Sequence, residues 1–256
     1  NGILPNSQRS AVLALVFKKG QVDDIANYRP ISLTNVDYRI LAFVLAGRLQ
    51  GVIDSIVSHD QTAYIKTRYM GQNIRLVEDV IEYYERMQNQ GIIFMTDFTK
   101  AFDSLEWDFM FKSLELFNFG PSFKQWIKTI YTLPVGKIKN NGHLSEQFEM
   151  TRGIRQSCPV SALIFILSVE VLSLKIRQEP DIKGLDLGVP NRKIKTVQYA
   201  DDCIIFLNDK NELGTALNVI REYGKISGLK LNLSKCGQNP AVLVFSNTPS
   251  IKGLCL

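Results

Sequence analysis

An acidic pair separates two apolar runs in residues 196–207, TVQYADDCIIFL. Apolar residues on both sides of Asp201 and Asp202 are typical of two buried strands joined by a tight polar turn. A further apolar run, IIFM at residues 92–95, leads directly into Asp97. Strands that leave one hydrophobic core and end in carboxylates gather hard oxygen ligands at one edge of a sheet. These three aspartates are therefore candidate ligands of a divalent cation.

Such a cluster suits Mg²⁺, which takes carboxylate oxygens and keeps places for water and substrate phosphates. Two ions about 3.5–4 Å apart can activate an attacking hydroxyl and stabilise a leaving oxygen in phosphoryl transfer. The simpler interpretation is that Asp201 and Asp202 form only a polar turn, where aspartate is common. Spacing along the sequence does not show that Asp97 and Asp201 meet.

The composition is that of an ordinary globular protein. The chain has 256 residues, of which 45% are hydrophobic and 21% charged, and its formal net charge is +5. One large or two modest domains fit this length. The composition excludes a disordered tail, a collagen-like repeat and a small disulfide-stapled module. The mild excess of basic residues is compatible with a polyanionic partner.

Four cysteines and two histidines are too widely spaced for a zinc site or a disulfide framework. A reducing compartment, and hence an intracellular protein that is not secreted, is favoured. The longest apolar stretches, such as residues 11–17 and 162–167, are too short to span a bilayer, so no membrane partner is expected. No charged-then-apolar leader opens the chain, which is expected to be a fragment of a longer protein.

Periodicity along the chain predicts an α+β fold. Helices are predicted at residues 38–57, 73–90, 104–117, 122–131, 161–178 and 212–227, the last ended by Gly228. Strands are predicted at residues 10–17, 92–95, 229–233 and 241–245, with hairpins at 137–150 and 196–207. This order favours one mostly antiparallel sheet backed by helices, with a boundary near residue 90.

An ordered series of motifs resembles the reverse transcriptases of non-long-terminal-repeat (LINE-type) retrotransposons. The motifs are NYRPISL (27–33), DQTAYI (60–65), DFTKAFDS (97–104), RGIRQSCP (152–159), YADD (199–202), and SGLKLN (227–232) with Lys235. The resemblance covers roughly residues 10–245. It implies an RNA-directed DNA polymerase that copies the RNA of its element into DNA by nucleotidyl transfer.

The resemblance also implies a right-hand polymerase fold. Residues 1–90 would form the fingers, and residues 91–256 the palm, a ferredoxin-like antiparallel sheet backed by helices. A thumb is expected to follow residue 256 rather than to lie within this chain. The implied partners are an RNA template, a DNA primer and deoxynucleoside triphosphates, within a nuclear or cytoplasmic ribonucleoprotein of the element.

Metal and substrate roles follow from the resemblance residue by residue. Asp97, Asp201 and Asp202, with the carbonyl of Phe98, match the ligands of two Mg²⁺ ions, for which Mn²⁺ is an alternative. Four residues match those that contact the incoming nucleotide in the family. Arg29 matches the arginine that binds the triphosphate, and Phe102 the residue beneath the sugar that excludes a 2′-hydroxyl. Gln156 matches a glutamine that contacts the nucleotide, and Lys235 a lysine that assists the leaving pyrophosphate. Contacts with template or primer match Lys18, Lys19 and Tyr199.

Several of these side chains also have a simpler interpretation. Phe102 could serve core packing, and Arg29 or Lys235 could be solvated surface charges, the commoner outcome for such residues. Asp103 opens the helix that follows Asp97 and is assigned a structural role as its cap.

Ser157 departs from the family pattern, which has glycine at this position. Glycine is usual where the backbone approaches a ligand closely or has a positive φ angle. Ala63 and Thr67 also replace glycines that are common in relatives. A second interpretation is therefore a nucleic-acid-binding remnant that no longer polymerises. A third, a metal-dependent phosphohydrolase, lacks a His or Glu cluster to activate water, and the intact aspartates favour an active polymerase.

Overall fold

The computed structural model describes residues 2–189, 193–232, 242–245 and 252–253, and it forms two compact units. Unit 1 consists of Asn1–Ile53 and Phe102–Phe165, and unit 2 of Asp54–Ala101 and Ile166–Leu256. Each unit is thus built from two separate parts of the chain. The division into fingers at 1–90 and palm at 91–256 remains a prediction.

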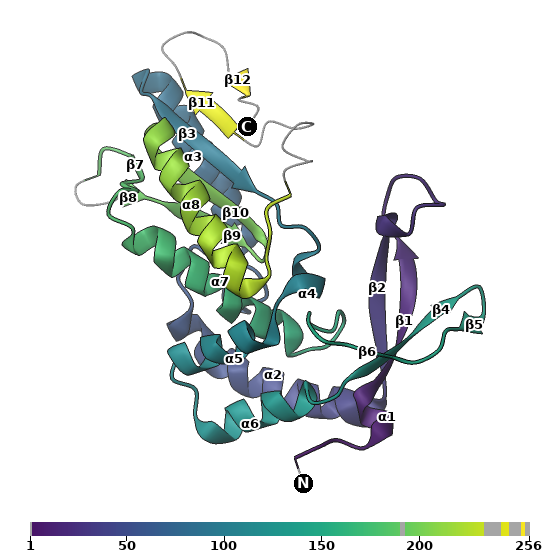
Figure 1. Ribbon diagram of the computed structural model, residues 1–256. Coiled ribbons are helices and arrows are strands. Elements are labelled where there is room, and N and C mark those ends of the chain that lie inside the picture. The colour runs from purple at the N-terminus through teal and green to yellow at the C-terminus, as the bar shows by residue number, and fades with distance from the viewer. Residues whose placement is uncertain (1, 190–192, 233–241, 246–251, 254–256) are drawn as a thin grey trace. The chain divides into compact units, whose positions relative to one another are not determined.

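An antiparallel five-stranded sheet forms the centre of unit 2, as predicted for the palm (Figure 1). Its strand order is β12-β11-β3-β10-β9. The bounds are β3 (Gly91–Thr96), β9 (Thr196–Tyr199), β10 (Asp202–Leu207), β11 (Val242–Phe245) and β12 (Lys252–Gly253). A separate pair, β7 (Leu185–Asp186) and β8 (Lys193–Ile194), lies beside it. The short turn between β9 and β10 carries the acidic pair.

Helices cover both faces of this sheet (Figure 1). On one face, Val80 and Tyr84 of α3 (Met70–Met87) pack with Ile93 and Phe206 in a buried cluster. The other face carries α8 (Lys210–Ser227) and the C-terminal part of α7 (Ser161–Gln178). These two helices are joined by a hydrogen bond from the Tyr223 hydroxyl to the carbonyl of Ser168, at 3.0 Å. The sheet is therefore held between two apolar helical layers.

Unit 1 contains a second five-stranded sheet, in the order β2-β1-β4-β5 with β6 also paired to β4. Its strands are β1 (Ser10–Phe17), β2 (Tyr28–Thr34), β4 (Val135–Asn140), β5 (His143–Leu144) and β6 (Phe148–Glu149). β1 pairs with β4 in parallel and with β2 in antiparallel orientation. The prediction of one sheet is therefore wrong, because apolar periodicity identifies strands but not their distant partners.

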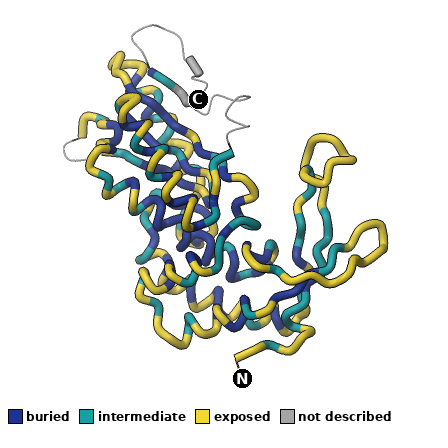
Figure 2. Tube along the Cα trace, in the orientation of Figure 1, coloured by how far each residue is buried: buried dark blue, intermediate teal, exposed yellow. Residues whose placement is uncertain are grey.

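The helices of unit 1 supply its core, while its hairpin tips are exposed (Figure 2). Tyr38 and Leu49 of α2 (Val36–Ile56) are buried, as are Met110 and Ile127 of the helices that follow. Those helices are α4 (Ala101–Ser104), α5 (Trp107–Leu116) and α6 (Pro121–Ile130), and the shorter α1 (Asn6–Arg9) and η1 (Ile25–Asn27) flank β1 and β2. Unit 1 thus has a packed helical base and a protruding sheet.

Most predicted helices are confirmed, and α7 has the predicted bounds. The helix predicted over 104–117 is α5, which begins later, at Trp107, and the short α4 precedes it. No strand forms over the described residues of 229–233, where Leu231 makes only an isolated bridge with Phe98. Within the described part of the chain, no helix has both the length and the apolarity needed to cross a bilayer.

Candidate active site

The strand register of unit 2 brings Asp97 to the acidic turn. Thr96 of β3 is paired with Cys203 of β10, so the next position along both strands holds Asp97 and Asp202. Directly opposite residues of antiparallel strands have Cα atoms about 4.5–5.5 Å apart. Asp201 precedes Asp202 in the turn. Carboxylates that are about a hundred residues apart in the sequence are therefore neighbours on the backbone.

Asp97 and Asp202 lie on one face of the sheet because side chains alternate along a strand. Thr96 and Cys203 are buried on the face away from α3, where the Thr96 hydroxyl donates to the carbonyl of Cys203 at 3.0 Å. Burial raises the pKa of the Cys203 thiol to about 12, so the thiol stays neutral. Asp97 and Asp202 point to the opposite face, together with Tyr199, which is exposed and paired with Asp202.

The segment at residues 230–232 supports Asp97 from the other side. Asn232 donates to Asp97 twice, from its backbone N–H to the carbonyl at 2.8 Å and from Nδ2 to Oδ2 at 3.1 Å. The backbone N–H of Thr99 donates to the carbonyl of Lys230 at 2.9 Å. These bonds flank Phe98, so its own carbonyl points away from Leu231. The SGLKLN motif thus fixes the backbone at the first aspartate.

Carboxylate and carbonyl oxygens are the ligands that Mg²⁺ prefers, so this donor set fits the cation chemically. Among the residues that the structure describes, however, no three His, Cys, Asp or Glu side chains are grouped so that they could hold a metal ion. Carboxylates repel one another unless a cation lies between them. The strand register brings the backbones of Asp97 and Asp202 together, and the metal site remains a prediction.

Arg29, Phe102 and Gln156, three of the nucleotide-binding candidates, lie in unit 1, where the RGIRQSCP motif runs beside α4. The backbone N–H of Ile154 donates to the carbonyl of Phe102 at 2.7 Å. Gly153 has a φ of +80°, and a Cβ atom there would lie 2.7 Å from the carbonyl oxygen of Asp103, so only glycine fits. The Gln156 side chain donates from Nε2 to Oδ1 of Asp103 at 3.0 Å. Asp103 lies inside α4, and this contact with Gln156 was not predicted.

Gln156 is also attached to the strand that carries Arg29. Its carbonyl accepts a hydrogen bond from the backbone N–H of Ser32 in β2, at 3.2 Å. Arg29 is exposed on the same strand, opposite Val16 of β1. Phe102 is half-buried and stacks on Phe165, with ring centroids 4.4 Å apart. Unit 1 thus holds three of the four predicted nucleotide contacts on connected elements.

The roles of all these residues remain predictions, as do those of three further candidates. Lys18 and Lys19 are exposed just beyond β1, where a nucleic acid could reach them. Lys235 lies outside the described residues.

Ser157 has a φ of +74°, the left-handed region that favours glycine, and its side chain is exposed. Ala63 and Thr67 do not have positive φ angles. The glycine expected at position 157 therefore has a conformational reason, and the chain adopts that conformation with serine.

Replacing Ser157 by glycine is expected to raise the free energy of unfolding by about 1 kcal/mol, because it removes the contact of Cβ with the backbone at this φ. Urea unfolding would measure the change. Ser157→Ala keeps the Cβ atom and should give no such gain. An unchanged or lower stability of Ser157→Gly would show that position 157 is not strained.

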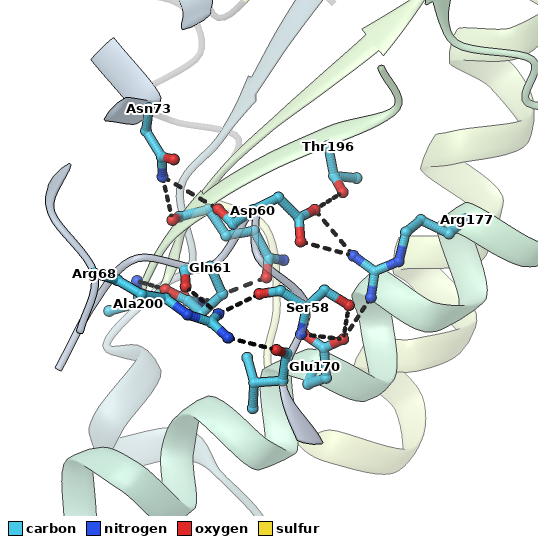
Figure 3. Close-up of polar contacts among 11 residues, drawn as sticks. Ser58, Asp60, Gln61, Arg68, Asn73, Glu170, Arg177, Thr196 and Ala200 are labelled. Atoms are coloured by element: carbon cyan, nitrogen blue, oxygen red, sulfur yellow. Dashed lines mark hydrogen bonds and ion pairs between the residues drawn. The ribbon is translucent and has the colours of Figure 1, made fainter. Parts of the chain in front are cut away.

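A partly buried polar network in unit 2 was missed by sequence reasoning (Figure 3). Arg177 of α7 donates from Nη1 to both carboxylate oxygens of Asp60, at 3.0 and 2.9 Å, and from Nη2 to Glu170. Glu170 is fully buried, and burial raises the pKa of its carboxyl. The Ser58 hydroxyl donates to Glu170 at 2.6 Å, and Thr196 donates to Asp60. The network fixes the segment after α2 against α7 and β9.

Arg68 completes this arrangement by capping the end of α2. Its guanidinium donates to the carbonyls of Val57 and Gln61, at 2.7 and 2.8 Å, and also to those of Asp54 and Ser58. The one sequence signal for this region was the DQTAYI motif, whose residues had no predicted role. Its polar side chains hold backbone groups, a function that no spacing rule reveals.

Comparison with known protein families matches residues 16–240 to the family described as reverse transcriptase (RNA-dependent DNA polymerase). A curated relative, the uncharacterized 149 kDa protein of transposon TX1 from Xenopus laevis, is 32% identical over 234 residues. The Pol polyprotein of the type-2 retrotransposable element R2DM from Drosophila melanogaster is 28% identical over 237 residues. These matches cover 91% and 92% of this chain but 18% and 22% of the relatives, so the chain spans about a fifth of their length.

Solved structures share the fold at low sequence identity. A telomerase from Candida albicans, in complex with a fragment of telomeric RNA, aligns with a TM-score of 0.59 at 11% identity. The alignment covers 96% of this chain and 44% of the telomerase chain. An apo telomerase from Candida tropicalis aligns with a TM-score of 0.61 at 12% identity. This alignment covers 94% of this chain and 51% of the telomerase chain. Mixed sheets backed by helices fit the fingers and palm of a right-hand polymerase.

Proposed function

Because the chain belongs to the reverse transcriptase family, and its relatives are proteins of non-LTR retrotransposons, we propose that it copies RNA into DNA as the polymerase region of a LINE-type element. The substrates are an RNA template, a DNA primer and deoxynucleoside triphosphates. The observation that carries the proposal is the register of β3 and β10, which brings Asp97 to Asp201 and Asp202. We place this activity in an intracellular ribonucleoprotein of the element.

In the reaction, the primer 3′-hydroxyl attacks the α-phosphate of the nucleotide, and pyrophosphate leaves. Asp97, Asp201, Asp202 and the carbonyl of Phe98 would hold two divalent cations, Mg²⁺ or Mn²⁺. When bound, such ions supply charge neutralisation and make the hydroxyl easier to deprotonate. The protein contributes mainly by positioning the reactants and stabilising charge.

The residues of unit 1 bind and select the nucleotide. The Arg29 guanidinium, exposed on β2, suits the oxygens of a triphosphate. Gln156, oriented by Asp103, presents its amide to the nucleotide. Phe102, supported by Phe165, lies beneath the sugar and excludes a 2′-hydroxyl. Lys235 is assigned to the leaving pyrophosphate, and Lys18, Lys19 and Tyr199 to template and primer.

Primer extension tests the proposal directly. The full protein that contains this chain is incubated with a primed homopolymer RNA, the matching deoxynucleotide and Mg²⁺, and product length is measured. Extension by the parent supports a polymerase. Extension only by Ser157→Gly, or duplex binding without extension in either protein, would favour the nucleic-acid-binding remnant. The strained backbone at Ser157 is the observation that keeps this alternative.

Shortening Phe102 to valine is expected to raise incorporation of ribonucleotides relative to deoxyribonucleotides by at least about tenfold, because the ring no longer blocks a 2′-hydroxyl. Single-nucleotide kcat/KM values for the two substrates give the ratio. Phe119→Val, which shortens one ring of another stacked pair in unit 1, should leave the ratio unchanged. An unaltered ratio in Phe102→Val would assign this ring to core packing alone.

A further inference from the structure

The turn that presents the acidic pair has an unusual backbone. Ala200, between Tyr199 and Asp201, has a φ of +56° and is buried. L-residues with a side chain rarely adopt this left-handed conformation unless their surroundings impose it. A group that holds the Ala200 peptide would therefore also determine the position of the backbone of Asp201 and Asp202.

Gln61 is that group. Its Oε1 accepts a hydrogen bond from the backbone N–H of Ala200 at 2.9 Å and another from Ala63 at 3.0 Å. Its Nε2 faces the carbonyl of Ala200 and Oε1 of Gln198, each at 3.4 Å. One side chain thus contacts both polar groups of residue 200. A primary amide suits this position because it carries donors and an acceptor at one end.

Gln61 is itself held in place, so its amide has a defined position (Figure 3). The side chain is completely buried, where water does not compete for its hydrogen bonds. Its backbone forms a parallel bridge with Gln198, flanked by bonds from Gln198 N–H to Asp60 O at 2.9 Å and from Thr62 N–H to Gln198 O at 3.1 Å. Asn73 donates to the carbonyl of Gln198 at 2.7 Å. The segment therefore lies along β9 like a short extra strand.

We infer that Gln61 is a positioning residue for the acidic turn: through Ala200 it sets the place of Asp201 and Asp202. The inference rests on the proposed function, because it assigns Gln61 to the same reaction. Gln61 is buried and acts on the reacting atoms only through the turn. Its loss should therefore slow the chemical step while leaving template and nucleotide binding nearly unchanged.

The test compares Gln61→Met with Gln198→Met in the full protein. Methionine has a similar length to glutamine but offers neither the donor nor the acceptor. Gln198 is an equally buried neighbour whose side-chain oxygen faces Gln61 and whose Nε2 has no hydrogen-bond partner among the described residues, which makes it a matched control. Gln61→Met is expected to lower kcat about 100-fold, the scale of a misplaced catalytic group. KM for the nucleotide and affinity for the primed template should stay within about threefold.

A second readout does not depend on activity. In the parent, the Ala200 N–H bonded to Gln61 should exchange slowly with deuterated solvent. Gln61→Met should speed its exchange at least tenfold, and Gln198→Met should not. Equal kcat losses in both variants, or unchanged exchange at Ala200 in Gln61→Met, would overturn the inference. If the parent itself extends no primer, the proposed function fails, and the exchange measurement still decides whether Gln61 holds the turn.

Discussion

Replacing Asp201 by asparagine is expected to lower primer extension at least about 1000-fold, to the background of the assay. The substitution keeps the shape of the side chain but removes the negative charge that would hold a divalent cation. Losing one preorganised electrostatic contact typically costs a factor of 100 to 1000 in kcat, and a metal ligand should cost no less. Incorporation of labelled deoxynucleotide on a primed RNA, followed at saturating Mg²⁺, would measure the loss.

The control is Asp181→Asn, which removes the same charge from an exposed aspartate of unit 2. Its rate should match that of the parent, and both variants should unfold at nearly the parent's urea midpoint. Activity retained in Asp201→Asn would contradict the assignment of the acidic turn to catalysis. If Asp201→Asn lost folded protein to the same extent as it lost rate, the result would no longer support a metal-binding role for Asp201.

The acidic turn was predictable from sequence because its signal is local. Apolar residues flank Asp201 and Asp202 closely enough to indicate two strands and a turn, and β9 and β10 have these positions. The apolar face of α7 and the glycine at the end of α8 are equally local features. That Asp97 lies opposite Asp202 is a long-range fact. It became an expectation only through the resemblance to reverse transcriptases, and the register supports it.

Long-range pairing and side-chain networks were not predictable in this way. The parallel pairing of β1 with β4 joins residues more than a hundred positions apart, and apolar periodicity says nothing about such partners. Polar residues in loops are expected to be exposed to solvent. Gln61 is nevertheless buried against β9, and Asp60 is paired with Arg177. What such side chains do depends on which backbone groups face them, and only coordinates show this.

Arg177→Met is expected to lower the free energy of unfolding by about 3–5 kcal/mol at pH 7. The guanidinium pairs with Asp60 and with the fully buried Glu170, so its removal leaves two carboxylates without their cation. Breaking a buried ion pair from one side has this cost because the remaining charge is desolvated and uncompensated. Urea unfolding curves of the parent and the variant would give the difference.

The loss should also grow with pH. Burial raises the pKa of Glu170 above its ordinary value of 4.5, with Asp60 adding to the rise, while Ser58 and Arg177 oppose it. A carboxyl whose pKa is raised on folding favours the folded state below its ordinary value and loses that contribution as pH rises through the raised one. Without Arg177 the pKa rises further. The stability of the variant should therefore continue to fall over a wider range above pH 4.5 than that of the parent.

Arg75→Met is the matched control, because Arg75 also pairs with an aspartate, at 2.8 Å, but its side chain is 70% exposed. An exposed pair within one helix contributes about 0.3–0.5 kcal/mol, so this variant should unfold almost like the parent at every pH. If Arg177→Met costs no more than Arg75→Met, the ion cluster around Glu170 does not stabilise unit 2. A large cost, by contrast, would mean that the segment carrying Gln61 is held by charge next to the turn it positions, since Asp60 precedes Gln61 in the chain.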